Sequence, residues 1–340
     1  MRLAAAIAAF ASAFATSADT PYNGPSVGPR YATDAYPAFE TTGSQTISPR
    51  KEPRWFSWFT GPKKDTPAEQ FAWAAECEAA GNRSKAARAY DALVREWPFS
   101  KEAPAAQTRL AEIRLVRDED FTEAFAEFRY LLDYYPLQCD YAEFSKRLYD
   151  TACTMRREGK RMMFMRFANT AEVRRAFEAV VLRAPGAAFA PAAMQAVAEL
   201  REDDDEQEQA IEVYANLRSV YPGSREAADS YIREAAARMC VLRRHGYNRD
   251  RRRDTISFIR MALRHVSGRD ARDTLQECLA EALEVEERED WESAKFYDSP
   301  TRTKRTAADA YRKFLEKHPA GEHAPAARSR LGELEERMEK

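Results

Sequence analysis

The chain has 340 residues, of which 44% are hydrophobic and 32% are charged, and its formal net charge is −2 at pH 7. A chain of this length can bury a sizeable core, and a charge so near zero excludes a global attraction to nucleic acid or acidic membranes. Only 12 glycines occur, and the sequence has no long run of alternating Val and Ile, which disfavours glycine-rich nucleotide loops and β-sheets. The composition therefore indicates an all-helical protein.

Residues 1–18 have the layout of a secretory signal peptide. Arg2 provides a basic start, a run of small apolar residues follows from Leu3 to about Phe14, and Ala18 is the preferred cleavage point. The run is too short to span a bilayer, and no cysteine follows it that could carry a lipid. We therefore expect an exported protein. An Ala-rich helix in a cytosolic protein is the alternative.

Residues 19–66 are rich in Pro, Gly, Ser and Thr without a sustained apolar period, which is typical of a flexible tether. Near the end of this tether, residues 54–59 contain four large aromatic side chains, which cost solubility unless they are covered. Three roles stay open: packing back onto the first repeat as a plug, insertion into a partner's groove, or peripheral contact with a membrane. The four aromatic residues are Trp55, Phe56, Trp58 and Phe59.

Helical periodicity begins at Thr66, where Thr66, Pro67 and Glu69 are typical of a capped helix start. From there on, one pattern recurs six times: a small residue, an aromatic or apolar residue four positions later, another apolar residue, and then a Pro that ends the helix. Residues spaced in this way share one helix face, so the pattern predicts a packing seam. The copies end at Pro98, Pro136, Pro185, Pro222, Ser267 and Pro319, with Ser267 standing in place of Pro.

Helix, turn, helix and Pro in this order is the layout of a tetratricopeptide (TPR) repeat. We predict that residues 67–340 form a TPR-like α-solenoid, a right-handed superhelix of about six antiparallel helix pairs with a C-terminal cap helix. The first helix of each pair is expected to line the concave wall that binds an extended segment or a helix of a partner protein. The predicted wall residues are Gln70, Trp73, Gln107 and Arg114.

Two charged segments interrupt the helical pattern. Residues 243–254 form an arginine-rich turn that would suit an acidic protein surface or another anion, with a merely solvated loop as the alternative. One basic segment without interleaved aromatics is a poor footprint for nucleic acid, so no nucleic-acid partner is expected. The acidic run 201–209 is interpreted as a turn between paired helices. The arginines predicted to bind a partner are Arg249, Arg251, Arg252 and Arg253.

The sequence contains no motif that would carry catalysis or bind a cofactor. The patterns HExxH, GxSxG and GxxxxGK are absent, and the five cysteines form no CxxC pair, which disfavours a zinc site. Buried free thiols are the expected state of these cysteines, and a Cys139–Cys153 disulfide stays open in an exported protein. We therefore predict a protein without catalytic residues, cofactor or metal.

The residues that follow the terminating Pro point to a narrower group. A small turn followed by Ala-Pro-x-Ala, as at residues 103–106 and 190–193, resembles the linkers of the TPR subunit of the bacterial outer-membrane β-barrel assembly machinery, the BamD/ComL family. The resemblance covers roughly residues 68–319 with interruptions, and the lipobox Cys that anchors family members is absent. Four blocks carry the resemblance: 87–110, 124–144, 175–194 and 293–319.

This resemblance implies a non-catalytic periplasmic scaffold, associated with the outer membrane, that binds components of outer-membrane β-barrel assembly. Two alternatives stay open. One is another cell-envelope TPR scaffold, of the type that coordinates the Tol-Pal system with division. The other is a cytosolic TPR adaptor, which would require that the N-terminus is not cleaved.

Overall fold

The computed structural model describes residues 61–117, 121–162, 170–244, 248–299 and 302–339. Within these ranges the chain forms thirteen α-helices and no strand, so the prediction of an all-α fold is confirmed. The predicted signal peptide, most of the predicted tether and its four aromatic residues lie outside the described residues. The helices are α4 Pro67–Ala79, α5 Arg83–Glu96, α6 Ala103–Arg117, α7 Phe121–Tyr134, α8 Tyr141–Met162, α9 Thr170–Arg183, α10 Ala190–Asp203, α11 Gln207–Val220, α12 Arg225–Arg244, α13 Arg249–His265, α14 Arg269–Tyr297, α15 Lys304–Lys317 and α16 Ala324–Glu339.

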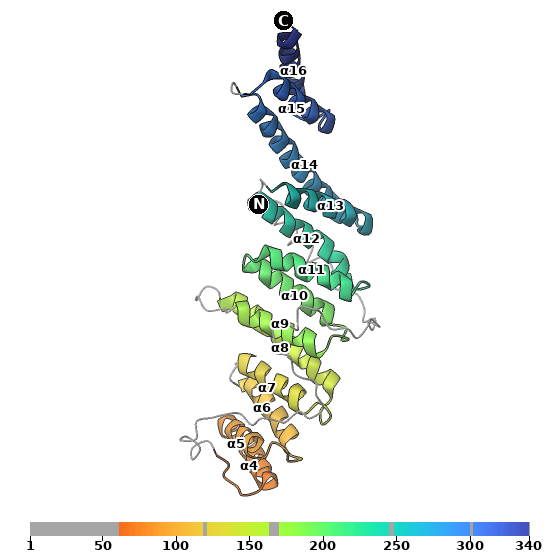
Figure 1. The fold of residues 1–340 in the computed structure, drawn as a ribbon. Coiled ribbons are helices and arrows are strands. Elements are labelled where there is room, and N and C mark those ends of the chain that lie inside the picture. The colour runs from red at the N-terminus through yellow and green to blue at the C-terminus, as the bar shows by residue number, and fades with distance from the viewer. Residues whose placement is uncertain (1–60, 118–120, 163–169, 245–247, 300–301, 340) are drawn as a thin grey trace. The chain divides into compact units, whose positions relative to one another are not determined.

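The described residues divide into two compact units. The N-terminal unit contains residues 61–205 and 216–227, and the C-terminal unit contains residues 206–215 and 228–339. Inside each unit, helices that follow one another in sequence pack side by side, for example α4 with α5, α5 with α6, and α15 with α16 (Figure 1). This nearest-neighbour packing of helix pairs is the architecture of a TPR-like solenoid, in agreement with the predicted fold class.

The predicted packing seams are buried in all six copies. Every seam side chain has at most 8% of its surface exposed, because the small residue admits the neighbouring helix and the larger ones fill the space beside it. This confirms the repeat spacing that the sequence indicated, including the copy in which Ser267 replaces Pro. The seam residues are Ala86, Tyr90, Leu93, Ala124, Phe128, Leu131, Val173, Phe177, Val180, Ala210, Tyr214, Leu217, Thr255, Ile259, Ala262, Ala307, Tyr311 and Phe314.

A tyrosine just before the terminating Pro ties one repeat of the N-terminal unit to the one before it. The Tyr135 hydroxyl donates to the carbonyl oxygen of Pro98 over 2.8 Å, and the Tyr221 hydroxyl donates to the carbonyl oxygen of Pro185 over 2.9 Å. Both tyrosines are buried, and burial raises the pKa of Tyr135, so its hydroxyl stays a donor at any ordinary pH. The Pro therefore ends a helix and also presents an acceptor to the next repeat.

The turns inside the helix pairs follow their sequence. Gly81 has φ 77° between α4 and α5, where a side chain would be strained, and the Asn82 side chain accepts a hydrogen bond from the backbone N–H of Lys85 to cap α5. The acidic run lies across the end of α10, the turn 204–206 and the start of α11, as predicted, and Asp205 in that turn has φ 68°.

All five cysteines are free thiols, so the Cys139–Cys153 disulfide that the sequence left open is not formed. Cys139 lies in the turn before α8, and Cys153 is about three turns into that helix. A rise of ~1.5 Å per residue over the twelve positions from Tyr141 to Cys153 puts Cys153 ~18 Å along α8 from its first residue, which is far from the turn that holds Cys139.

The end of α14 is fixed to α15 and α16 by one carboxylate, and this contact makes a testable prediction about pH. Asp298 accepts hydrogen bonds from Arg330 Nε over 2.7 Å, from Arg330 Nη2 over 3.1 Å and from the Tyr311 hydroxyl over 3.1 Å. The hydrogen bonds from Arg330 hold the pKa of Asp298 below its ordinary value. A carboxylate whose pKa is lower in the folded than in the unfolded state stabilises the fold at neutral pH, and this contribution is lost as pH falls through the folded pKa.

We therefore expect Asp298→Asn to lower the free energy of unfolding by about 1 kcal/mol at pH 7, since Arg330 is 34% exposed and the pair is partly screened. The difference between variant and wild type should shrink as pH is lowered from 7 toward 2, because the wild-type carboxylate takes up a proton as pH falls through its folded pKa. Urea unfolding followed by circular dichroism at both pH values measures this. Asp309→Asn is the matched control, because Asp309 is 62% exposed in its pair with Arg312. Equal effects of the two variants would contradict the assignment.

Candidate protein-binding groove

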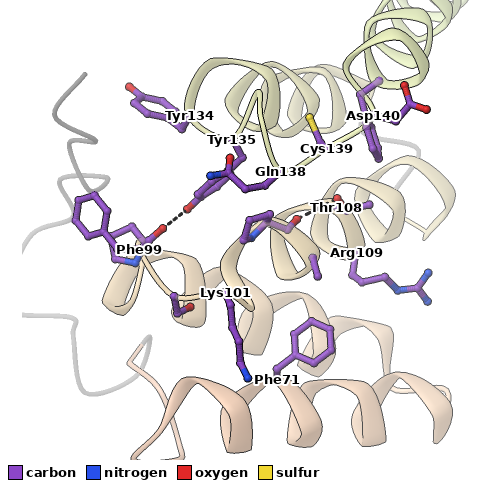
Figure 2. Close-up of a pocket in the computed structure, with 15 residues that line it drawn as sticks. Phe71, Phe99, Lys101, Thr108, Arg109, Tyr134, Tyr135, Gln138, Cys139 and Asp140 are labelled. Atoms are coloured by element: carbon purple, nitrogen blue, oxygen red, sulfur yellow. Dashed lines mark hydrogen bonds between the residues drawn. The ribbon is translucent and has the colours of Figure 1, made fainter. Parts of the chain in front are cut away.

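A cavity of about 760 Å³ lies within the N-terminal unit, along the first helices of its first three pairs. It is bordered by α4, α6 and α8 and by the two turns that follow α5 and α7 (Figure 2). We call it the first-repeat groove. The lining residues are Phe71, Pro98, Phe99, Ser100, Lys101, Pro104, Ala105, Thr108, Arg109, Tyr134, Tyr135, Gln138, Cys139, Asp140 and Phe144.

The repeat junctions build the wall of this groove. Pro98 and Pro136 end α5 and α7, so the chain turns back at the same end of two successive pairs. The hydrogen bond from the Tyr135 hydroxyl to the Pro98 carbonyl oxygen joins these turns, and it is drawn in Figure 2. Pro104 stands in the first turn of α6, where a missing N–H costs nothing, and its carbonyl oxygen accepts from the Thr108 hydroxyl over 3.0 Å. The wall is therefore held by backbone geometry and internal hydrogen bonds.

Accessible aromatic side chains give the groove its chemical character. Phe99 is 76% exposed, while Phe71 and Tyr134 are half-buried and present part of their rings. Each half-buried ring is held from behind: Phe71 lies 5.5 Å from the ring of Tyr90, and Tyr134 lies 4.4 Å from the ring of Tyr130. Rigid aromatic surface costs little conformational entropy on binding, and it is the side-chain type enriched at protein interfaces.

A polar rim surrounds these aromatics. Arg109 is exposed, and its guanidinium donates to both carboxylate oxygens of Glu78 and to Glu112 Oε2 over 2.7 Å. These hydrogen bonds raise the pKa of Arg109 above its ordinary value, with Glu78 the main cause. Lys101 and Asp140 are also exposed, so both signs of charge border the apolar floor. An apolar centre with a charged rim is the anatomy of a protein-binding surface.

The residue after the terminating Pro distinguishes this groove from the other repeat junctions. Five junctions make the same turn. In each, the backbone N–H of the second residue after the Pro donates to the carbonyl oxygen of the residue before it. The donors and acceptors are Ser100 and Trp97, Gln138 and Tyr135, Ala187 and Ala184, Ser224 and Tyr221, and Gly321 and His318. The residue after the Pro is Phe99 and Leu137 in the first two turns and Gly186, Gly223 and Ala320 in the others. Gly81 is the one glycine with positive φ among the described residues, so these turns accept any side chain. The turn therefore does not require the bulk of Phe99 and Leu137, which are 76% and 93% exposed. Phe99 lines the groove itself, and Leu137 lies in the turn that borders it.

Two residues predicted for the binding wall are buried, and that part of the prediction is wrong. Gln70 has no exposed surface: its Nε2 donates to the Ala89 carbonyl oxygen over 3.0 Å, and its Oε1 accepts from the N–H groups of Lys63 and Lys64. Gln107, at the matching position of the next pair, is equally buried and donates to the Glu127 carbonyl oxygen over 2.9 Å. These amides brace the first helix of a pair against the second, so they do not face a partner.

The other two predicted wall residues lie outside the groove lining. Trp73 is half-buried, with the Lys85 ammonium 5.0 Å from the centre of its ring. Arg114 is 30% exposed and pairs with Glu123 over 3.0 Å. Neither residue lines the groove with Phe71, Phe99 and Tyr134, although first helices do border the groove, as predicted.

The arginine-rich segment is helical on both sides of residues 245–247, because α12 continues to Arg244 and α13 begins at Arg249. Arg249, Arg251 and Arg253 are exposed, and Arg251 pairs with Glu208. Arg252 is 1% exposed and lies against Glu289 of α14, and burial lowers its pKa. Because Arg252 is buried in the C-terminal unit, it is not part of a surface patch, and the prediction that it binds a partner is wrong.

Two negative findings hold for the part of the chain that the structure describes. No group of three or more His, Cys, Asp or Glu side chains there is arranged so that it could hold a metal ion. None of the described helices combines the length and apolar character needed to cross a membrane.

No protein-family model matches the sequence, and no curated protein sequence matches it either. Solved structures give weak likenesses: a tetratricopeptide repeat protein from Parabacteroides merdae (12% identity, 79% of this chain, 98% of that chain, TM-score 0.28), MamA (16%, 64%, 95%, 0.27) and the type IV pilus biogenesis factor PilW (14%, 77%, 98%, 0.25). TM-scores this low carry no weight for function. The helix pairs and their seams themselves define a TPR-like repeat protein.

Proposed function

We propose that this protein is a non-catalytic scaffold of the bacterial cell envelope that binds partner proteins through the first-repeat groove. The exposed Phe99, which lines the same cavity as Phe71 and Tyr134 and stands at a turn where three other repeats have Gly or Ala, is the observation that carries the proposal. A large apolar side chain exposed at a position that does not need it is most simply explained by a partner that covers it.

The shape and chemistry of the groove favour an extended segment or a short helix as the bound element. The groove is bordered by three first helices and two turns, so several residues of a partner can lie along it. Aromatic or large aliphatic anchors would pack on Phe71, Phe99 and Tyr134, and flanking charges would meet Lys101, Arg109 and Asp140.

Outer-membrane β-barrel assembly is the process we propose for this scaffold, in the periplasm and next to the outer membrane. The support is the sequence resemblance, and the groove falls largely within it: residues 98–109 and 134–144 lie in the blocks 87–110 and 124–144 that resemble the barrel-assembly TPR subunit. The signal-like residues 1–18 support export.

Affinity purification of the tagged protein from crosslinked cell envelopes tests this function. We expect a component of the β-barrel assembly machinery among the captured proteins, and N-terminal sequencing of the mature protein should show removal of residues 1–18. Capture of division or peptidoglycan-binding proteins in place of barrel-assembly components would favour the other envelope scaffold. An intact N-terminus together with cytosolic partners would contradict the proposal.

A further inference from the structure

The described chain begins next to α4, a helix that borders the first-repeat groove. The backbone N–H groups of Lys63 and Lys64 donate to Gln70 Oε1 over 3.0 and 3.1 Å, and Gln70 is itself fixed by its bond to the Ala89 carbonyl oxygen. The next residue of α4 after Gln70 is Phe71, which lines the groove. The chain that precedes Lys63 is thus tied to the helix that forms one wall of the groove.

The aromatic residues of the tether are within reach of the groove from this anchor. Phe59 precedes Lys63 by four residues and Trp55 precedes it by eight. At roughly 3.4 Å per residue, an extended chain reaches up to ~14 Å and ~27 Å from the anchor, and the anchoring residue Gln70 directly precedes Phe71 of the groove. The motif is therefore within reach of the groove.

The motif also matches the groove chemically. Residues 54–59 carry four large aromatic rings in six positions, while the groove presents Phe71, Phe99 and Tyr134. Aromatic rings pair favourably in offset or edge-to-face contacts, and a cavity of about 760 Å³ has the size of a site that takes several side chains. A contact between the two sets of rings would remove apolar surface from water.

We propose that residues 54–59 dock in the first-repeat groove of their own chain and that a partner must displace them to bind. The docked motif is then an autoinhibitory plug, and this regulatory part of the inference rests on the function proposed above. A tethered competitor has a high effective concentration. The plug therefore lowers the apparent affinity of every partner that binds to Phe71, Phe99 and Tyr134, and only partners that bind these rings tightly displace it.

Cys139 provides an internal reporter, because it lines the groove and is partly exposed. The full chain and its variant W55A/F56A/W58A/F59A are treated with a maleimide at one fixed pH, and modification of each cysteine is followed by peptide mass spectrometry. We expect Cys139 to react at least fivefold faster in the variant. Cys153 and Cys240, which are also partly exposed but do not line the groove, are the controls and should react at unchanged rates. Equal rates at Cys139 in the two proteins would overturn the proposal.

A second measurement avoids any doubt about the folding of a fourfold variant. Ser57 lies between the two aromatic pairs, so Ser57→Cys should form an intramolecular disulfide with Cys139 when the full chain is oxidised mildly with diamide. Ser44→Cys, in the same tether but further from the anchor, is the matched control and should crosslink at least fivefold more slowly. Equal yields would overturn the plug.

The two proposals can fail separately. If the plug fails in both measurements while envelope partners are still captured, the proposed function stands without it. If the plug holds and no partner is captured, the proposed function fails and the contact within the chain stands.

Discussion

Replacing Phe128 by Ala is expected to lower the free energy of unfolding of the N-terminal unit by about 3–5 kcal/mol. Phe128 has no exposed surface, stands in the middle of the seam of α7, and its ring centre lies 6.1 Å from that of Phe144 in α8. Removal of the ring deletes buried apolar surface and leaves a cavity that packed neighbours fill only partly.

Urea unfolding followed by helical circular dichroism measures this loss. Because repeats are stabilised by their nearest neighbours, part of the circular-dichroism signal should be lost at a lower urea concentration than in the wild type, while the rest of the transition stays unchanged. Phe296→Ala is the control: Phe296 is 63% exposed, and its removal should change stability by no more than about 0.5 kcal/mol. A loss below about 1 kcal/mol for Phe128→Ala would contradict the assignment of the seam as core.

The double variant Phe99→Ala/Leu137→Ala is expected to weaken partner binding at least thirtyfold while leaving stability within about 0.5 kcal/mol of wild type. Both side chains are largely exposed and occupy the same place in two successive turns, so their loss costs the folded state little. An aromatic anchor at the centre of an interface is worth about 2 kcal/mol or more, which corresponds to a thirtyfold change in Kd.

Titration of the captured partner against wild type and variant, by calorimetry or by fluorescence anisotropy, measures the change. Val116→Ala is the matched control, because Val116 is 63% exposed on α6 but does not line the groove. Unchanged affinity of the double variant, or an equal loss in Val116→Ala, would place the binding surface elsewhere.

The seams could be predicted from the sequence because they depend on local rules. Spacing along a helix fixes which residues share a face, and Pro fixes where that helix ends, so Ala86, Tyr90 and Leu93 are recognisable without any tertiary information. The same holds for the cap of α4, where the Thr66 hydroxyl accepts from the Glu69 N–H over 3.3 Å.

The polar wall residues could not be predicted, because their burial depends on segments far away in the sequence. Gln70 and Gln107 have the polarity of surface residues, and each is buried because a carbonyl oxygen about twenty residues later accepts its amide. Arg252 is buried for the same reason: its carboxylate partner Glu289 lies on α14, more than thirty residues later in the sequence. A single sequence contains no local signal for such contacts.

The groove itself did leave a signal in the sequence. Aligned on the terminating Pro, Phe99 and Leu137 stand where the other copies have Gly186, Gly223 and Ala320. A turn that accepts a small residue three times and a large apolar one twice points to a role for the large ones outside the turn. What the alignment could not show is that Phe71, Tyr134 and Arg109 line the same cavity as Phe99, since this depends on how the helices pack.

Site-specific photo-crosslinking at position 99 in living cells tests the central claim most directly. A photoreactive phenylalanine in place of Phe99 should crosslink to a β-barrel assembly component, and the same probe in place of Val116, which is similarly exposed on α6, should not. If position 99 gives no partner crosslink, or if both positions give the same products with equal yield, the first-repeat groove is not the protein-binding site.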